Sequence, residues 1–267
     1  MTLIIAHGVA RSGSTFLYQV ARDVAEAING LHHNKAKALF FPEVDVPDYV
    51  FQPPDELIGL LVRLLPPAAA FVMKTHGRIT PLIASGIRSG SIKAIVSFRD
   101  PRDAVISMLD AGIRDREIGS NRGFSSLYKA EDALQPVRSG WQAARDWAYF
   151  PGVLPVPYIL TAIKQDFVIG LVCDYLSAAH CCHNIQERYA QDKRTRIGEF
   201  HKGVADRFLE DLTPEEIVKV SESLEREIAE SDALVARWMQ TYGFRLLHQV
   251  LYERRKTRLR EIVGSTL

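Results

Sequence analysis

The segment Gly8–Thr15, which reads GVARSGST, constrains the fold more than any other part of the chain. A short apolar run, residues 3–6, precedes it, and after it apolar residues recur at steps of three and four. Strand, glycine loop and amphipathic helix in this order predict a loop whose backbone N–H groups lie at a helix N-terminus, where they and the helix dipole favour an anion. The segment therefore predicts an α/β protein with a phosphate site after its first strand.

The loop departs from the triphosphate-binding pattern G-x-x-x-x-G-K-[ST] at one decisive position. Gly8, Gly13 and Thr15 match the pattern, but Ser14 stands where the lysine belongs and Arg11 supplies the cation. In nucleoside triphosphate enzymes that lysine reaches the β- and γ-phosphates. Its absence disfavours ordinary ATP chemistry, whereas backbone amides and a forked arginine still suit a nucleotide with a single 5′-phosphate.

Strands alternate with helices along the chain, which predicts a three-layer α/β fold with a mostly parallel central sheet flanked by helices. We treat residues 1–267 as one domain. Polar clusters follow three of the expected strands: the glycine loop, Lys74-Thr75-His76 and Arg99-Asp100. Ligands of such sheets bind beyond the carboxyl ends of the strands, so these clusters predict the functional site.

Other segments are predicted from local pattern. Asp100 and Pro101 are typical of a helix start and predict a helix over 100–112, in which Ser107 lies on the polar face. The mostly apolar run at residues 156–163 predicts a strand. The segments 32–56 and 113–137 lack a clean period and predict irregular structure.

Composition excludes several classes of protein. The net charge of +1 provides no overall field for nucleic acid, and no apolar run approaches the roughly 20 residues of a membrane span. Three cysteines are too few for a disulfide framework and favour a reducing cytoplasm. Four adjacent residues, His180–His183, cannot readily close one tetrahedron, so we expect no metal site. The basic stretch 252–260 favours a solvated helix, with a polyanion or partner site as the alternative.

Four motifs, in order, resemble those of the sulfotransferases that use 3′-phosphoadenosine 5′-phosphosulfate (PAPS). RSGSTFL at 11–17 is similar to their 5′-phosphosulfate loop, and MKTH at 73–76 to the Lys-Thr-His of the cytosolic branch. RDPRDAVISM at 99–108 is similar to their 3′-phosphate motif, and FHKGVADRF at 200–208 to their C-terminal nucleotide loop R-K-G-x-x-G-D-W. In this last motif His201 replaces the arginine, and we match Ala205 to the second glycine and Arg207 to the tryptophan.

The resemblance implies that PAPS or its product, adenosine 3′,5′-bisphosphate (PAP), binds at two phosphate sites. The 5′-phosphosulfate side is assigned to Arg11, Ser12, Gly13, Ser14 and Thr15, and the 3′-phosphate side to Arg99, Ser107, Lys202 and Gly203.

The same resemblance implies a catalytic set that needs no metal. His76 is the expected general base, because an unperturbed histidine titrates near neutral pH. Lys74 would hold the sulfonate oxygens, and Arg11 would stabilise the bridging oxygen. The expected acceptor is a hydroxyl, or an amine, of a small molecule, lipid or carbohydrate.

Two other interpretations stay open. The first is a P-loop kinase acting on a small molecule or nucleotide, against which Ser14 in the lysine position argues. The second is a non-catalytic nucleotide-binding module on the same fold, against which the joint presence of His76, Lys74 and Arg11 argues.

Overall fold

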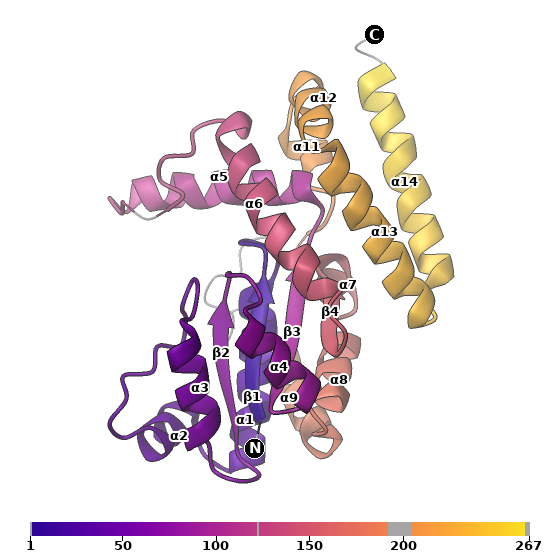
Figure 1. The fold of residues 1–267 in the computed structure, drawn as a ribbon. Coiled ribbons are helices and arrows are strands. Elements are labelled where there is room, and N and C mark those ends of the chain that lie inside the picture. The colour runs from indigo at the N-terminus through magenta and orange to yellow at the C-terminus, as the bar shows by residue number, and fades with distance from the viewer. Residues whose placement is uncertain (1, 122, 192–203, 265–267) are drawn as a thin grey trace. The chain divides into compact units, whose positions relative to one another are not determined.

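The computed structural model describes residues 2–121, 123–191 and 204–264, and within them it is an α/β protein with a parallel four-stranded sheet in the order β2-β1-β3-β4 (Figure 1). The fold class expected from the sequence is confirmed. The strands are β1 (Thr2–Gly8), β2 (Ala70–Thr75), β3 (Ile92–Phe98) and β4 (Val153–Pro157).

Strand β1 is interior to the sheet and pairs in parallel with both β2 and β3. Its residues Leu3 to Ala6 are fully buried, as expected of a continuous apolar strand covered on both faces. The register aligns His7 with Thr75 and Gly8 with Ser97. The carboxyl ends of these strands therefore meet at one edge of the sheet, as the polar clusters predicted.

The chain forms two compact units. The first comprises Met1–Gly8, Gly13–Ser97 and Ala143–Gly203, and the second Val9–Ser12, Phe98–Gln142 and Val204–Leu267. The expectation that residues 1–267 act as a single domain stays a prediction.

Helices of the first unit cover the sheet. These helices are α1 (Ser14–Asn29), α2 (His33–Phe40), α3 (Asp55–Leu64), α4 (Pro81–Ser89), α7 (Tyr158–Ile163), α8 (Gln165–Tyr175) and α9 (Cys182–Gln191), with a 3₁₀ turn at Ala179–Cys181. By the right-handed crossover rule, α1 and α4, the first helices of the connections from β1 to β2 and from β2 to β3, lie on opposite faces of the sheet (Figure 1). Helix α3, the last helix of the first connection, packs beside α4.

The second unit is helical in its described part. It contains α5 (Pro101–Glu117), α11 (Phe208–Asp211), α12 (Pro214–Ser223), α13 (Glu225–Thr241) and α14 (Arg245–Gly264), while α6 (Ala130–Ala148) contributes residues to both units.

Helix α5 begins as its sequence predicted but is far more buried than expected. The Asp100 side chain accepts from the Arg102 backbone N–H, and Pro101 occupies the first turn. Asp103 and Ser107, which the sequence placed on a polar face, are 1% and 7% exposed. The polar face of α5 therefore lies in the interior, where each polar group needs a partner.

One local prediction was wrong and two were correct only in part. Residues 158–163 form α7 rather than a strand, because β4 ends at Pro157 and a short apolar run carries no reliable period. The segment 32–56 contains α2, and the segment 113–137 contains the end of α5 and the start of α6. In the part of the chain that the structure describes, no helix has the length and apolar character to cross a bilayer.

Candidate functional site

Within the first unit, the end of β2 brings two predicted catalytic residues together with the start of α1. The Lys74 ammonium donates to Thr15 Oγ1 at 2.8 Å. Lys74 and His76 are two residues apart and both are half-buried. Thr15, the last residue of the segment Gly8–Thr15, therefore fixes the position of the Lys74 ammonium.

The hydrogen bond of His76 defines which of its ring nitrogens carries a proton. Nδ1 lies 2.5 Å from the carbonyl oxygen of Gly8, and a carbonyl can only accept. Nδ1 therefore donates, and in the neutral ring Nε2 keeps its lone pair. His76 is thus oriented by the last residue of β1, with Nε2 as the atom able to take a proton.

A segment that the sequence left irregular runs along β2 beside this pair. The Lys74 N–H donates to the Asp48 carbonyl at 2.9 Å, and the Val50 N–H donates to the Lys74 carbonyl at 3.0 Å. These bonds place the Tyr49 ring 5.9 Å from the Lys74 ammonium and 5.4 Å from the His76 ring. Tyr49 was missed by sequence reasoning, although tyrosine, valine and phenylalanine at 49–51 are residue types enriched in strands.

Gly13 starts α1 in a conformation that strongly favours glycine. Its φ is +85°, and a Cβ at this position would lie 2.9 Å from Cδ2 of Tyr158. Tyr158 directly follows β4, at the carboxyl edge of the sheet. This tyrosine was also missed, because residues 156–163 were assigned to a strand and the end of β4 was not recognised.

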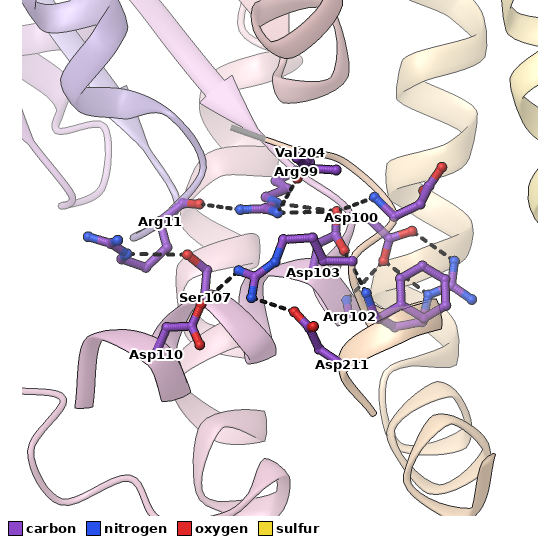
Figure 2. Close-up of polar contacts among 12 residues, drawn as sticks. Arg11, Arg99, Asp100, Arg102, Asp103, Ser107, Asp110, Val204 and Asp211 are labelled. Atoms are coloured by element: carbon purple, nitrogen blue, oxygen red, sulfur yellow. Dashed lines mark hydrogen bonds and ion pairs between the residues drawn. The ribbon is translucent and has the colours of Figure 1, made fainter. Parts of the chain in front are cut away.

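Within the second unit, Arg11 contacts the predicted 3′-phosphate residues (Figure 2). Arg11 has a left-handed φ of +69°, and its Nε donates to Ser107 Oγ at 3.3 Å. Arg99 Nη1 donates to the Arg11 carbonyl at 3.3 Å, and its Nη2 donates to the Val204 carbonyl at 3.0 Å. The structure thus puts Arg11, which the resemblance assigned to the 5′-phosphosulfate side, in contact with Arg99 and Ser107, which it assigned to the 3′-phosphate side.

Asp103 is the buried acceptor that organises this cluster. It accepts from Arg99 Nε at 3.4 Å and from the backbone N–H groups of Asp206 at 2.8 Å and Phe208 at 3.2 Å. Burial raises the pKa of Asp103 against the opposing effect of Arg99, and the carboxylates of Asp100 and Asp206 add to the rise. No sequence pattern indicates this role, since an aspartate in the first turn of a helix is commonly solvated.

The turn Val204–Phe208 changes one detail of the C-terminal motif. Asp206, with φ +60°, and not Ala205 adopts the left-handed conformation that a second glycine would supply. An ungapped match to R-K-G-x-x-G-D-W also puts Asp206 at that glycine and Phe208 at the tryptophan. The Arg102 guanidinium lies over the Phe208 ring at 4.1 Å.

The remaining predicted residues are distributed as follows. Lys202 and Gly203 lie outside the described residues. Ser12 and Ser14 are buried, and the Ser12 hydroxyl donates to the Val9 carbonyl at 2.6 Å. A search of the described residues for a group of three or more histidine, cysteine or acidic side chains able to hold a metal found none.

The chain was compared with known proteins by sequence and by structure. By sequence, neither a protein-family model nor a curated protein matches it. By structure, it is similar to mouse sulfotransferase SULT7A1 complexed with PAP, at a TM-score of 0.53 and 13% identity over 90% of this chain and 88% of that one. It is also similar to retinol dehydratase in complex with retinol and PAP, at a TM-score of 0.50 and 16% identity over 85% and 81%. The chain has a sulfotransferase-type fold.

On this fold, one buried residue beside the candidate base stands out. His7, the penultimate residue of β1, is fully buried and stacks on Trp147 at 5.1 Å between ring centroids. Among the described residues, neither ring nitrogen of His7 has a hydrogen bond of good geometry, although the backbone groups of His76 and Gly77 interact with the ring and oppose the fall of its pKa. Burial, with a further contribution from His76, lowers the pKa of His7 to about 3.

We predict that His7 makes the stability of the protein fall in acid. The unfolded state takes up a proton below pH 6.5 and the folded state does so only near pH 3, so stability is full above 6.5 and is lost as pH falls. The slope attributable to His7 is about 1.4 kcal/mol per pH unit in that window. Urea unfolding of wild type and His7→Gln from pH 4 to 8 measures it. The difference in the free energy of unfolding between wild type and His7→Gln should be constant above pH 6.5. If the two free-energy curves stay parallel below pH 6.5 as well, the prediction is wrong.

We predict that Gly13→Ala destabilises the protein more than Gly30→Ala. Both residues have positive φ, but nothing lies within 4 Å of a Cβ at Gly30, whereas Tyr158 obstructs one at Gly13. Gly30→Ala carries only the left-handed penalty of about 1 kcal/mol, and Gly13→Ala adds a steric term of about 1–3 kcal/mol. Chemical unfolding gives both values. Tyr158→Leu in the Gly13→Ala background should recover the steric part, and equal costs for the two glycines would contradict the account.

Proposed function

We propose that the protein is a PAPS-dependent sulfotransferase that moves a sulfonate group to a hydroxyl, or an amine, of a small-molecule, lipid or carbohydrate acceptor. The observation that carries the proposal is the hydrogen bond from His76 Nδ1 to the Gly8 carbonyl. It leaves Nε2 as a base two residues from Lys74, at the end of a strand of a sulfotransferase-type fold.

The chemistry assigns one task to each cation and to the base. His76 Nε2 takes the acceptor proton as the acceptor oxygen forms its bond to sulfur, and the bond from sulfur to the 5′-phosphate oxygen breaks. Lys74 stabilises the sulfonate oxygens. Arg11 stabilises the charge that develops on the leaving phosphate, as a preorganised group aimed at the transition state. No metal is required by this sequence of steps.

The phosphate contacts fit a nucleotide with two separated phosphates. Arg11 and the loop residues Ser12 to Thr15 would hold the 5′-phosphosulfate. Arg99 and Ser107 would hold the 3′-phosphate, together with Lys202 and Gly203. Arg99 supports this role because its backbone and side-chain partners already hold its guanidinium in place, so less entropy is lost on binding.

The fold by itself does not choose among activities, since related scaffolds carry different chemistries. One of the similar structures bears the name retinol dehydratase and the other the name sulfotransferase, and both contain PAP. A kinase or a non-catalytic nucleotide-binding module on this fold remains the alternative. As three free thiols, Cys173, Cys181 and Cys182, are found among the described residues, we propose a reducing compartment such as the cytoplasm.

We predict that PAP raises the melting temperature of the protein far more than AMP or ATP-Mg²⁺ at equal concentration. Only PAP offers both a 5′- and a 3′-phosphate, and charge-assisted contacts are stronger than neutral ones. A ligand present at 100 times its Kd adds about 2.7 kcal/mol of stability. A thermal shift titration measures the three ligands in parallel. A larger shift with ATP-Mg²⁺ would favour the kinase, and equal shifts with AMP and PAP would remove the 3′-phosphate site.

We predict that His76→Asn loses most of the transfer activity while keeping PAP affinity. The asparagine amide can still donate to the Gly8 carbonyl in place of Nδ1, but it is not a base. Loss of a general base costs about 10²–10⁴ in rate. Calorimetric PAP binding and steady-state transfer from labelled PAPS separate the two effects.

Ser107→Ala is the matched variant for the opposite effect. It removes a hydroxyl that contacts Arg11 without leaving a buried charge, which Arg99→Ala would do at Asp103. We expect PAP to bind about tenfold more weakly and the turnover at saturating PAPS to fall much less. Full activity in His76→Asn would mean that the base lies elsewhere. A loss of PAP affinity in His76→Asn as large as that in Ser107→Ala would make His76 a nucleotide residue.

A further inference from the structure

We propose that Arg255, on the C-terminal helix α14, is a positioning residue for the 3′-phosphate side of the nucleotide site. It holds the turn Val204–Phe208 to the N-terminus of α5, from which Arg99 and Ser107 act. The inference rests on the proposed function for its ligand, and on contacts within the second unit for its mechanism.

Arg255 joins three segments that are far apart in the sequence. Its Nε donates to Asp206 Oδ1 at 2.7 Å, and its Nη1 lies 3.1 Å from Asp232 Oδ1 and 3.2 Å from Asp100 Oδ2. These carboxylates belong to the Val204–Phe208 turn, to α13 and to the N-cap of α5, respectively. The Arg255 side chain is only 14% exposed, so these contacts are largely shielded from solvent.

The charges in this cluster are strongly coupled. Burial disfavours the charged form of Arg255, but Asp100, Asp206 and Asp232 outweigh it and raise the pKa of the guanidinium. Burial also disfavours the charged form of Asp100, yet Arg102 and Arg255 hold its pKa well below the usual range. Removing one member of such a buried network leaves its partners uncompensated. The neighbouring segments are therefore sensitive to Arg255.

The contacts of the turn lead from Arg255 to the phosphate residues. The Asp206 side chain pairs with Arg255, and the Asp206 N–H donates to Asp103. Asp103 in turn accepts from Arg99, whose Nη2 donates to the carbonyl of Val204 (Figure 2). A shift of the turn would thus take the Val204 carbonyl from Arg99, and the Asp206 and Phe208 N–H donors from the Asp103 carboxylate that holds Arg99. The turn also follows directly on Lys202 and Gly203 in the chain.

Two features point to a supporting role for Arg255, one in the turn and one in α14. Asp206 has φ +60°, a conformation uncommon outside glycine, although aspartate is among the residues that adopt it most often. Within α14, all of whose residues are described, no residue is buried. The ion pairs of Arg255 therefore take on a share of the docking of α14 that apolar packing provides for most helices.

The same helix offers a control. Arg258, three residues beyond Arg255, pairs with Glu210 at 3.3 Å and with no second carboxylate among the described residues, and both side chains are substantially exposed. An exposed single pair contributes little to stability. Arg258→Met therefore removes a positive charge from α14 without touching the turn.

The test compares Arg255→Met with Arg258→Met by calorimetric binding of PAP and AMP, and by hydrogen exchange of the Asp206 and Phe208 amides without nucleotide. We expect Arg255→Met to weaken PAP binding about tenfold and AMP binding less than about twofold, with faster exchange at both amides. Arg258→Met should match wild type in all three measurements. Asparagine tolerates positive φ, so Asp206→Asn keeps the turn conformation but loses the ion pair with Arg255. It should also weaken PAP binding and speed exchange of the amides at 206 and 208, and it replaces Arg255→Met in the test if that variant does not fold.

Each other outcome overturns the inference or a defined part of it. Equal losses of PAP and AMP affinity would make Arg255 a general structural residue. Unchanged exchange at Asp206 and Phe208 in both Arg255→Met and Asp206→Asn would overturn the positioning role. If wild type binds PAP no better than AMP, the proposed function fails and the nucleotide part of the inference fails with it, while the exchange data alone still decide whether Arg255 holds the turn.

Discussion

The candidate site depends first on the parallel pairing of β1 with both of its neighbours. Because β1 lies inside the sheet, its carboxyl end is aligned with that of β2 on one side and that of β3 on the other. Gly8 therefore ends its strand where its carbonyl can accept from His76. The chain then turns directly into the glycine loop. A slip in this register would separate the base from the residue that orients it.

The second unit depends on a different interaction, the acceptance of three N–H groups by the buried carboxylate of Asp103. Arg99 and the backbone of the Val204–Phe208 turn share this one acceptor group. Such a network is stable only when its members are satisfied together, because each buried charge or donor left alone is costly. Arg99 is thus held in part by groups that have no proposed contact with the ligand, the Asp103 carboxylate and the Val204 carbonyl.

The two groups of residues differ in how they would control the reaction. Near β2, a histidine and a lysine are oriented by a carbonyl and a hydroxyl, two uncharged groups. Near α5, arginines and aspartates alternate in a buried cluster that fixes position through charge. The first arrangement suits proton transfer, which needs a base near neutrality. The second suits an anionic ligand, which needs a cation held firmly in place.

The sequence alone determined the fold class, the glycine loop, the start of α5 and the order of the four motifs. These features are local: a buried strand, a glycine position and a helix cap are each written in a few adjacent residues. Local pattern was insufficient at residues 158–163, where an apolar run fits a strand and a helix equally. The roles of Tyr49, Tyr158, Asp103 and Arg255 were decided only by tertiary structure. Each acts through a partner far away in the chain, and neither periodicity nor spacing records which distant segment a side chain will meet.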